Sequence, residues 1–455
     1  MKSKWFIVGL SPVLALSVVI TSCSVGKKAK VENVNSAVAD KLATQGRTTE
    51  AAEMYSRIGE LLLIPEGIQY ADEMFDKALA INPNDGKANF YSAITKPLMA
   101  AQGFITRMEP IVDANGSANL IKLKDAIDEL RLPELIKFAN ELPAGKKQFE
   151  SYYDVQRAVR TELLPAVAAS VDKVAKLKAP LKLNINLSRL GLRSKNPKYN
   201  YTTEYSYENT YCQKGEWNQT THNWECTSTI TERNFYTTWT SNYDPTPTEY
   251  NLDDADLTII RSAAQGALNS LRINTAYSIK GLEHLIKKWE AYERVHGKMN
   301  ARSAVKLINA YSELGTLESD NLLSDVSKSA ADTAKNMLDL ATLQNDLCNN
   351  PARQYGSNLF TQICIIGSDL KNLQVLSDLL AGPKKVEFGG DNLTILMDVN
   401  AILYNPPRDL HALLPNAFDV YGNVSTLQDP TVGGLFPNGD LIEKLKANGT
   451  IKQGW

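Results

Sequence analysis

The sequence predicts a mainly α-helical fold of helical hairpins and a long-helix bundle, with one disulfide-pinned β-hairpin insertion. Apolar residues recur every three or four positions through most of residues 36–180 and 253–382, which is the period of an amphipathic helix. Residues 181–252 begin instead with the alternation of a half-buried strand, seen at Leu181 and Leu183. Two cysteines flank a turn-like segment inside this insertion, which predicts that a disulfide pins the hairpin.

The first 22 residues have the features of an export signal. Lys2 and Lys4 supply a positive start, and an apolar run from Trp5 to Ile20 follows. This run is too short to span a bilayer comfortably, as expected for a signal peptide that is removed. It ends in Ile20-Thr21-Ser22-Cys23, which resembles the lipobox of bacterial lipoproteins.

The lipobox resemblance implies cleavage after residues 1–22 and acylation of Cys23. Acyl chains such as palmitate on its thiol and amino group would anchor the protein stably, because more than one chain is attached. Residues 23–35 would then be a lipidated tether. By resemblance to proteobacterial lipoproteins, Ser24 favours the outer membrane over the inner membrane, with the chain facing the periplasm. The alternative is an ordinary secretory signal with a chance cysteine.

The charge balance gives no indication of a nucleic-acid partner. The chain has 49 Lys and Arg against 51 Asp and Glu, and removal of the signal takes away two more lysines. Nucleic-acid binding would require a clustered basic excess. The only basic cluster, Lys27-Lys28-Ala29-Lys30, lies beside the proposed anchor and is interpreted as part of a solvated tether. No later apolar stretch approaches about 18 residues, so no second membrane segment is expected.

Residues 36–140 are helical in pattern, and part of them has the spacing of one tetratricopeptide repeat. The residues that carry this spacing are Tyr55, Ile58, Gly59, Leu62, Ala71, Phe75, Ala78 and Pro83. The large side chains are expected to fill the seam between two antiparallel helices, where Gly59 and Ala71 allow close approach. Pro65-Glu66-Gly67 would form the turn, and Pro83 would end the second helix because it lacks an N–H.

The resemblance to the tetratricopeptide repeat family implies a concave protein-binding surface that carries no chemistry. The sequence does not decide the repeat frame before residue 52, because Glu50 to Ile58 could also be the second helix of an earlier hairpin that begins near Val31. A generic stack of helical hairpins with one chance match is the alternative interpretation.

The helical body is predicted to comprise residues 141–180 and 253–382. Pro165 should kink or split the first part. In the second part the apolar pattern continues to about His296, which would make a helix about 60 Å long if unbroken. Residues 383–455 are rich in proline and glycine and are expected to form a loop-rich C-terminal wrap over the body.

The insertion carries an unusual row of aromatic residues. Five tyrosines occupy odd positions, which in a regular strand would put them on one face: Tyr199, Tyr201, Tyr205, Tyr207 and Tyr211. They are interpreted either as packed on helices with their hydroxyls at the rim, or as an exposed platform for a partner protein or a glycan.

Four cysteines follow Cys23, an even number at short spacings as expected for local disulfides in an exported chain. The predicted pairs are Cys212–Cys226 across the hairpin turn and Cys348–Cys364 at a corner between two helices. Each would contribute roughly 3 kcal/mol in the chain-entropy model. The competing interpretation is a metal site of Cys212, His222 and Cys226, which has no obvious fourth ligand and no familiar zinc spacing.

The sequence has no recognised catalytic motif, so no enzyme activity and no cofactor or metal is expected. Asp409 and His411 are the nearest to an acid–histidine pair, but residues at this spacing usually serve a turn, and no Gly-x-Ser-x-Gly nucleophile accompanies them. Asp429 and Asp440 could bind calcium in principle, but they lack a recognisable ligand spacing.

These features predict a membrane-anchored periplasmic lipoprotein that acts as a protein-interaction scaffold or adaptor in envelope assembly, secretion or transport. One alternative resembles the helical lipoprotein component of periplasmic substrate-uptake systems, which pairs with a binding protein and would bind an apolar ligand. The other is an envelope enzyme with an unrecognised site. A shallow concave face would favour the adaptor, an apolar tunnel the ligand carrier, and a deep polar cleft the enzyme.

Overall fold

The computed structural model describes residues 36–63, 67–115, 141–185, 199–218, 223–241, 248–348, 367–388, 393–422 and 424–447. These residues are mainly helical, with small antiparallel strand pairs, so the predicted fold class is confirmed at this level. The signal, Cys23 and the tether lie outside the described residues, as does the predicted turn at Pro65 and Glu66.

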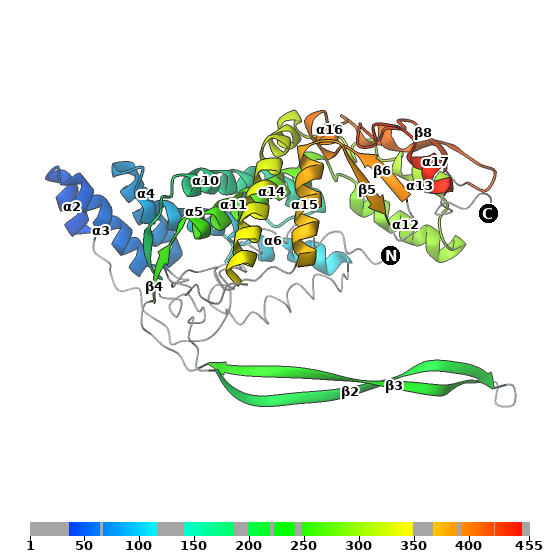
Figure 1. Cartoon of the computed structure of the whole chain (residues 1–455), viewed down its shortest axis with the longest axis horizontal. Coiled ribbons are helices and arrows are strands. Elements are labelled where there is room, and N and C mark those ends of the chain that lie inside the picture. Colours follow the sequence, from blue (N-terminus) through cyan, green and yellow to red (C-terminus); the bar gives the residue numbers. More distant parts are fainter. Residues whose placement is uncertain are drawn as a thin grey trace.

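The main architectural feature is a row of helices in which each helix packs on the next (Figure 1). The row begins with the N-terminal helices α2 (Ala37–Thr44), α3 (Thr48–Leu61), α4 (Ile68–Ile81) and α5 (Gly86–Ala101). It continues through α10 (Leu164–Ala175), α11 (Asp254–Ala276), α14 (Asp320–Cys348) and α15 (Gly367–Ala381). The N-terminal helices and the body therefore form one continuous array.

A single apolar core joins the first half of this row. It contains Phe75 and Tyr91 from the N-terminal helices together with Val174, Leu183 and Leu252 from the segments that follow. A second core lies between α6 (Phe104–Asn115), α9 (Tyr152–Ala158) and the same row, and it includes Phe104 and Phe149. Because the first core crosses from α5 to α10, the predicted N-terminal region and the body share buried side chains.

A π-helical turn interrupts the helix that contains Pro165. The run consists of α9, the π turn η2 (Val159–Leu163) and α10. Proline lacks an N–H and its ring clashes with the preceding turn of a helix. The widened turn lies immediately before Pro165, as expected where an α-helical ladder has to adjust.

Two short strands close the base of the insertion. β1 (Leu181–Ile185) pairs antiparallel with β4 (Thr248–Leu252), and Leu181 lies opposite Leu252. Leu183 and Leu252 are fully buried in the first core, so this pair is fixed to the helical row.

Between β1 and β4, a long hairpin of β2 (Tyr199–Asn218) and β3 (Asn223–Ser241) lies apart from the row (Figure 1). At the usual rise per residue, strands of this length extend about 65 Å.

The long helix expected to continue to His296 is divided in two. α11 begins with a capping box, in which the Asp253 side chain accepts from the Asp256 backbone and the Asp256 side chain accepts from the Asp253 backbone. It ends at Ala276, and α12 (Leu282–His296) follows after Gly281, whose φ is 86°. At the break Tyr277 forms a β-bridge with Leu317. The apolar pattern that continues to about His296 is therefore divided between two helices, because distant segments bind the backbone at this point.

The rest of the chain covers the end of the row. Its helices are α13 (Ala301–Ile308), α16 (Val399–Tyr404), the 3-10 helix η4 (Leu410–Leu413) and α17 (Leu441–Ala447). Two strand pairs, β5 (Lys384–Phe388) with β6 (Leu393–Met397) and β7 (Pro415–Phe418) with β8 (Val424–Leu427), accompany them. Within the described ranges, every helix is too short or too polar to span a lipid bilayer.

Candidate functional site

The predicted repeat residues lie in or next to the seam between α3 and α4. Tyr55, Ile58, Gly59, Leu62, Ala71, Phe75 and Ala78 are all buried there, and Pro83 follows the end of α4. A Cβ atom at Gly59 would lie 2.7 Å from Cζ and 2.8 Å from Cδ1 of Phe75. These distances are too short for a real Cβ atom, so α3 and α4 can pack this closely only because residue 59 has no side chain. Phe75 also stacks on Tyr91 of α5, with 5.3 Å between ring centroids.

Polar contacts border this seam and tie neighbouring helices together. The Tyr55 hydroxyl of α3 donates to the Asp40 carboxylate of α2. Burial and this hydrogen bond raise the pKa of Tyr55 to about 12. Burial, followed by the nearby Glu60 carboxylate, also raises the pKa of Tyr91. Both phenols therefore remain protonated donors, which is a structural role and gives no reactive group.

A cluster of charges links α4 and α5, and Lys173 of α10 lies near it. The Asp72 carboxylate accepts from the Thr95 hydroxyl at 2.6 Å and from Lys96 Nζ at 2.7 Å, and Lys96 also reaches Asp76 at 2.5 Å. Burial opposes the charge of Lys96, but the two carboxylates outweigh it and raise its pKa. Burial lowers the pKa of the nearby Lys173 of α10. The contacts of Asp72 and Asp76 with Lys96 neutralise these charges and fix α4 to α5.

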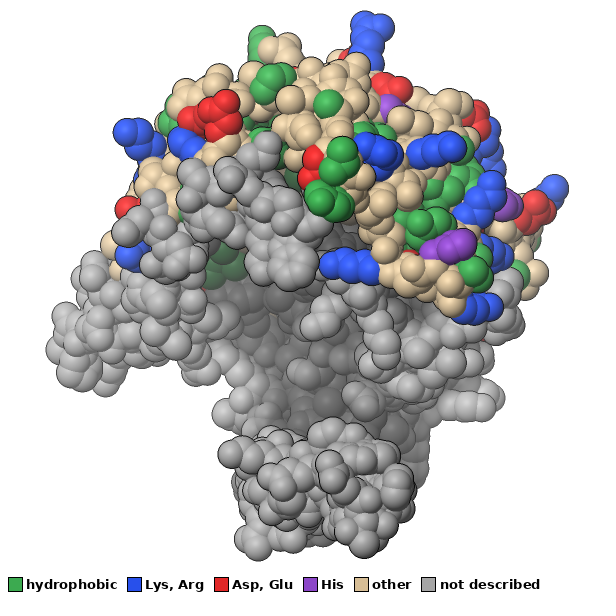
Figure 2. All heavy atoms as spheres, turned by 90° about the vertical axis from the view of Figure 1, so that its right-hand side faces the viewer, with side chains coloured by type: hydrophobic (Ala, Val, Ile, Leu, Met, Phe, Trp, Pro, Cys, Tyr) green, Lys and Arg blue, Asp and Glu red, His purple; other side chains and the backbone are tan. Residues whose placement is uncertain are grey.

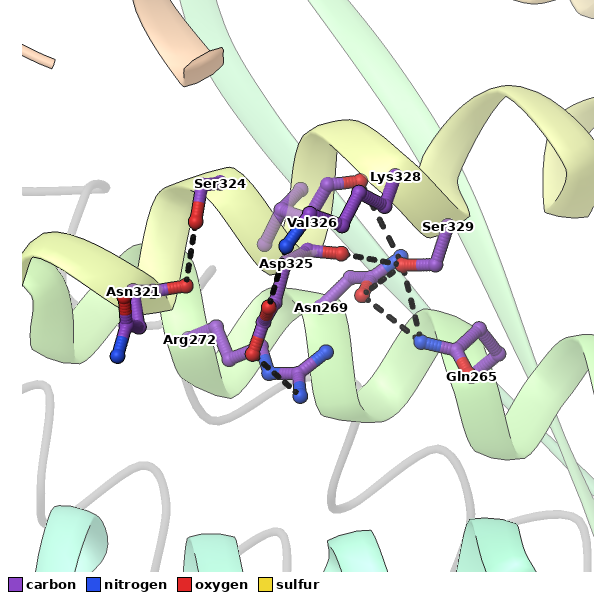
Figure 3. A network of polar contacts seen from close by, with 9 residues as sticks. All are labelled: Gln265, Asn269, Arg272, Asn321, Ser324, Asp325, Val326, Lys328 and Ser329. Carbon is purple, nitrogen blue, oxygen red and sulfur yellow. Dashed lines mark hydrogen bonds and ion pairs between the residues drawn. The ribbon is translucent and has the colours of Figure 1, made fainter. Parts of the chain in front are cut away.

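A polar network occupies the contact between α11 and α14 (Figure 3). Gln265 Nε2 donates to Asn269 at 3.0 Å and to Ser329 at 3.1 Å, and the Ser329 hydroxyl lies 2.9 Å from Asn269 Oδ1. One turn further along, Arg272 pairs with Asp325 at 3.2 Å. Because buried polar groups need such partners, the network fixes the register of these two helices.

The predicted tyrosine platform lies on β2, and its register differs from the expected one. Tyr201 lies opposite Trp239, whereas Thr203 lies opposite Thr238, so the pairing shifts by one residue between them. A shift of this kind changes the phase of the alternation along a strand. The five tyrosines therefore do not keep one phase: Tyr199 and Tyr201 precede the shift, and Tyr205, Tyr207 and Tyr211 follow it. The expectation of a single face was wrong for this reason.

The two hairpin cysteines are not cross-strand partners. Cys212 lies opposite Thr229, and Cys226 lies opposite Gly215. An offset of three residues corresponds to about 10 Å along a strand, which exceeds the Cα separation of a disulfide. A Cys212–Cys226 bridge, which stays a prediction, requires a different register here. Cys348 is the last residue of α14, and Cys364 and His222 lie outside the described residues.

The acidic candidates in the C-terminal region organise turns. Asp409 caps η4, and its carboxylate lies 2.6 Å from His411 Nδ1 and accepts from the His411 backbone at 2.9 Å. Asp429 accepts from the backbone of Thr431 at 2.9 Å and of Gly433 at 2.6 Å, while Asp440 pairs with Lys444. Over the described ranges no group of three or more His, Cys, Asp or Glu could hold a metal ion.

Two features were missed at the level of sequence. Gln156 caps the break between α11 and α12, donating to the carbonyls of Asn274 and Tyr277 and accepting from the Ile279 backbone. No local pattern marks this residue. The second feature is an excess of basic residues over residues 287–306, which contain six Lys and Arg but only two Glu. Its members are spread over α12, α13 and the segment between them and do not form a continuous run in the sequence, although their excess over acidic residues is visible there.

Comparison with known proteins gives no relative, because no family model, no curated protein and no solved structure matches the chain.

Proposed function

We propose that this protein is a membrane-anchored, periplasm-facing lipoprotein of the bacterial outer membrane. It acts as a protein-interaction scaffold or adaptor in envelope assembly, secretion or transport, and not as an enzyme. The single observation that carries the interaction role is the long β2–β3 hairpin, which projects from a helical row whose polar clusters have structural roles.

The hairpin is a suitable binding element because of its pairing. Among the described residues, β2 and β3 pair with each other and with no other strand. A two-stranded hairpin alone is marginally stable in water. Its outer edges carry backbone donors and acceptors that an additional strand can pair with, as in recognition by strand addition. A protein partner that supplies such a strand would stabilise the hairpin, and its tyrosines would supply contact area at low entropic cost.

The helical row supports the same proposal. The α3–α4 hairpin has the buried seam and the glycine contact that a tetratricopeptide-like unit requires. The succession of helices from α2 to α15 has the one-dimensional packing of a solenoid, in which each element contacts its neighbours. We propose that this row is a rigid support that holds the hairpin at a distance from the membrane anchor.

Excision of the hairpin should separate partner binding from folding. We expect that replacing residues 199–241 with a short Gly-Ser linker leaves the thermal midpoint of the body within about 2 °C, because β1 and β4 close the base independently. The same variant should no longer capture the envelope partner that the intact chain captures after crosslinking. Calorimetry and quantitative mass spectrometry of crosslinked material measure the two effects.

A matched control keeps the hairpin and changes only its aromatic residues. Threonine in place of all five tyrosines preserves strand propensity and removes the aromatic contact area. If partner capture persists after excision of residues 199–241, the hairpin is not the binding element. If it is lost after excision but persists in the threonine variant, backbone pairing and not the tyrosines provides recognition.

The anchor makes a separate prediction. Cys23→Ala should abolish labelling by a palmitate analogue and leave an unprocessed precursor, because the acylated thiol is the proposed attachment to the membrane. Cys348→Ala is the matched control and should be labelled and processed as the unmodified chain is. Normal labelling of the Cys23→Ala variant would contradict the lipoprotein assignment.

A further inference from the structure

An exposed basic surface lies at the end of the molecule that carries α12 and α13. Its six basic side chains are Lys287, Lys288, Arg294, Lys298, Arg302 and Lys306. All six are exposed, and none forms an ion pair within the part of the chain that the structure describes. With Glu290 and Glu293 included, residues 287–306 carry a charge of +4, whereas the whole chain carries −2. Figure 2 faces this end of the molecule and shows Lys and Arg side chains beside apolar and histidine side chains, with acidic side chains interspersed.

An apolar turn projects beside this surface, between β7 and β8. Val420 is 85% exposed and Tyr421 is 62% exposed. The turn is held from within, because the Asp419 carboxylate accepts from the Tyr421 backbone at 2.9 Å and Gly422 adopts a φ of 85°. At the end of α12, Val295 is also 74% exposed.

Arg302 of the basic surface braces the apolar turn directly. Its guanidinium donates to the Asp419 carbonyl at 2.6 Å, and its backbone N–H donates to the Gly422 carbonyl at 3.2 Å. A Cβ atom at Gly422 would lie 2.9 Å from the Asn300 side chain, so the turn packs closely on the start of α13. The two exposed apolar side chains are therefore presented on a rigid support and are adjacent to positive charge.

We propose that this end of the molecule contacts an anionic lipid surface, with Val420 and Tyr421 entering the headgroup region and the basic side chains meeting the lipid phosphates. Each basic residue near an anionic membrane contributes attraction, and an aliphatic and an aromatic side chain at the tip supply apolar contact at the interface. The apolar residues project on a turn, a shape that a fluid bilayer can accommodate.

The proposal rests on the membrane location given under Proposed function and adds a second point of contact. α2, which follows the tether, and the α12–α13 end lie at opposite ends of the helical row (Figure 1). Attachment at both ends would hold the row along the membrane surface.

Hydrogen exchange of the full chain tests this contact at the predicted residues. The purified protein is reconstituted with vesicles of phosphatidylcholine alone or of phosphatidylcholine mixed with phosphatidylglycerol. We expect roughly tenfold slower exchange in peptides covering α13 and the β7–β8 turn in the anionic vesicles, with reversal at high salt. Neutral vesicles should give no such protection, although an acylated chain is attached to both.

Two double variants locate the contact. Val420→Ser with Tyr421→Ser, and Arg294→Glu with Lys298→Glu, should each remove the protection, while circular dichroism confirms that these exposed substitutions leave the fold intact. Tyr70→Ser is the matched control, because Tyr70 is 52% exposed on α4 at the other end of the row. It should leave the protection unchanged.

The other outcomes overturn the proposal. Equal protection in neutral and anionic vesicles, or none in either, excludes recognition of anionic lipid. Protection that rises with protein concentration in the absence of vesicles assigns the surface to a second copy of the chain. Because the comparison is between two vesicle compositions, a chain that lacks acylation at Cys23 but gains protection from anionic vesicles would refute the anchor and leave the lipid contact standing.

Discussion

Phe75→Ala should lower the free energy of unfolding by about 3–5 kcal/mol, the usual cost of truncating a core aromatic residue. The Phe75 side chain is fully buried, stacks on Tyr91 and fills the space that Gly59 leaves open. Alanine would leave a cavity between α3, α4 and α5. These helices also pack on other elements and therefore cannot close the cavity fully. Urea unfolding followed by circular dichroism measures the change.

The region that loosens should be larger than the repeat itself. The Phe75 core continues into α10 and into the β1–β4 pair through Leu183 and Leu252. Hydrogen exchange should therefore accelerate in α3–α5 and also at the base of the insertion. Exchange confined to α3 and α4 would show that the core is divided between two independent units.

Tyr70→Ala on the same helix is the matched control. Tyr70 is 52% exposed, and substitutions at such surface positions usually change the free energy of unfolding by no more than about 0.5 kcal/mol. Gly59→Ala adds a coupled test, because its methyl group would collide with the Phe75 ring but not with an alanine at that position. It should therefore be strongly destabilising alone and tolerated in the Phe75→Ala background. Additive costs would contradict the contact.

The seam could be predicted because its information is local. Tyr55, Gly59, Ala71 and Phe75 lie within one helix–turn–helix segment, and their spacing alone places them on facing surfaces. The strand that begins at Leu181 could also be predicted from neighbouring residues, because apolar and polar residues alternate strictly there directly after a segment with a helical period. In both cases the residues whose spacing predicts the helix or strand are also the residues that form its packing contacts.

Other features depend on partners that are distant in the sequence. The break after Ala276 is stabilised by Gln156, more than one hundred residues earlier, and by Leu317. Nothing between Ala276 and Gly281 reveals these contacts, so the apolar period alone predicts a continuous helix. Tyrosines at odd-numbered positions share one face only if the two strands pair regularly. The shift in pairing after Tyr201 depends on both strands and cannot be read from one of them.

The two proposed binding surfaces also depend partly on local sequence and partly on distant contacts. The tyrosine-rich segment is apparent from its composition, whereas the fact that β2 and β3 pair with no other described strand follows from the topology. The basic surface combines residues 287–306 with a turn at Val420 and Tyr421, and these segments meet only through the folded contact with Arg302. Sequence patterns can suggest each half of such a site, but their proximity is a tertiary property.

Arg107→Ala should lower the free energy of unfolding by about 2–4 kcal/mol, somewhat less than the loss of a fully buried ion pair. The guanidinium donates to both carboxylate oxygens of Glu162, at 2.9 and 3.1 Å, and to the Lys147 carbonyl at 2.9 Å. It also lies 4.1 Å from the centroid of the Phe149 ring. The substitution removes all these contacts and leaves Glu162, which is partly exposed, with Lys146 as its remaining cation.

Arg107→Lys is the conservative control. Lysine keeps the charge but lacks the planar fork that matches a carboxylate, so we expect an intermediate loss of stability. Arg157→Ala provides a surface comparison, since Arg157 is exposed and pairs with Asp154 at 3.4 Å. It should change the free energy of unfolding by less than about 1 kcal/mol. Equal effects of Arg107→Ala and Arg157→Ala would contradict the buried role of Arg107.

The pH dependence of stability provides an independent measure of the same pair. Burial opposes the charge of Glu162, but hydrogen bonds from Arg107 and Lys146 outweigh it and lower its pKa below the ordinary value of 4.5. A carboxyl whose pKa is lower in the folded state stabilises the protein fully above its unfolded pKa, and this contribution is lost as the pH falls through the folded pKa. The difference in unfolding free energy between the unmodified chain and Glu162→Gln should therefore be constant near neutral pH and shrink below about pH 4.5. A difference that stays constant down to about pH 3 would mean that packing, and not the ion pair, accounts for the effect.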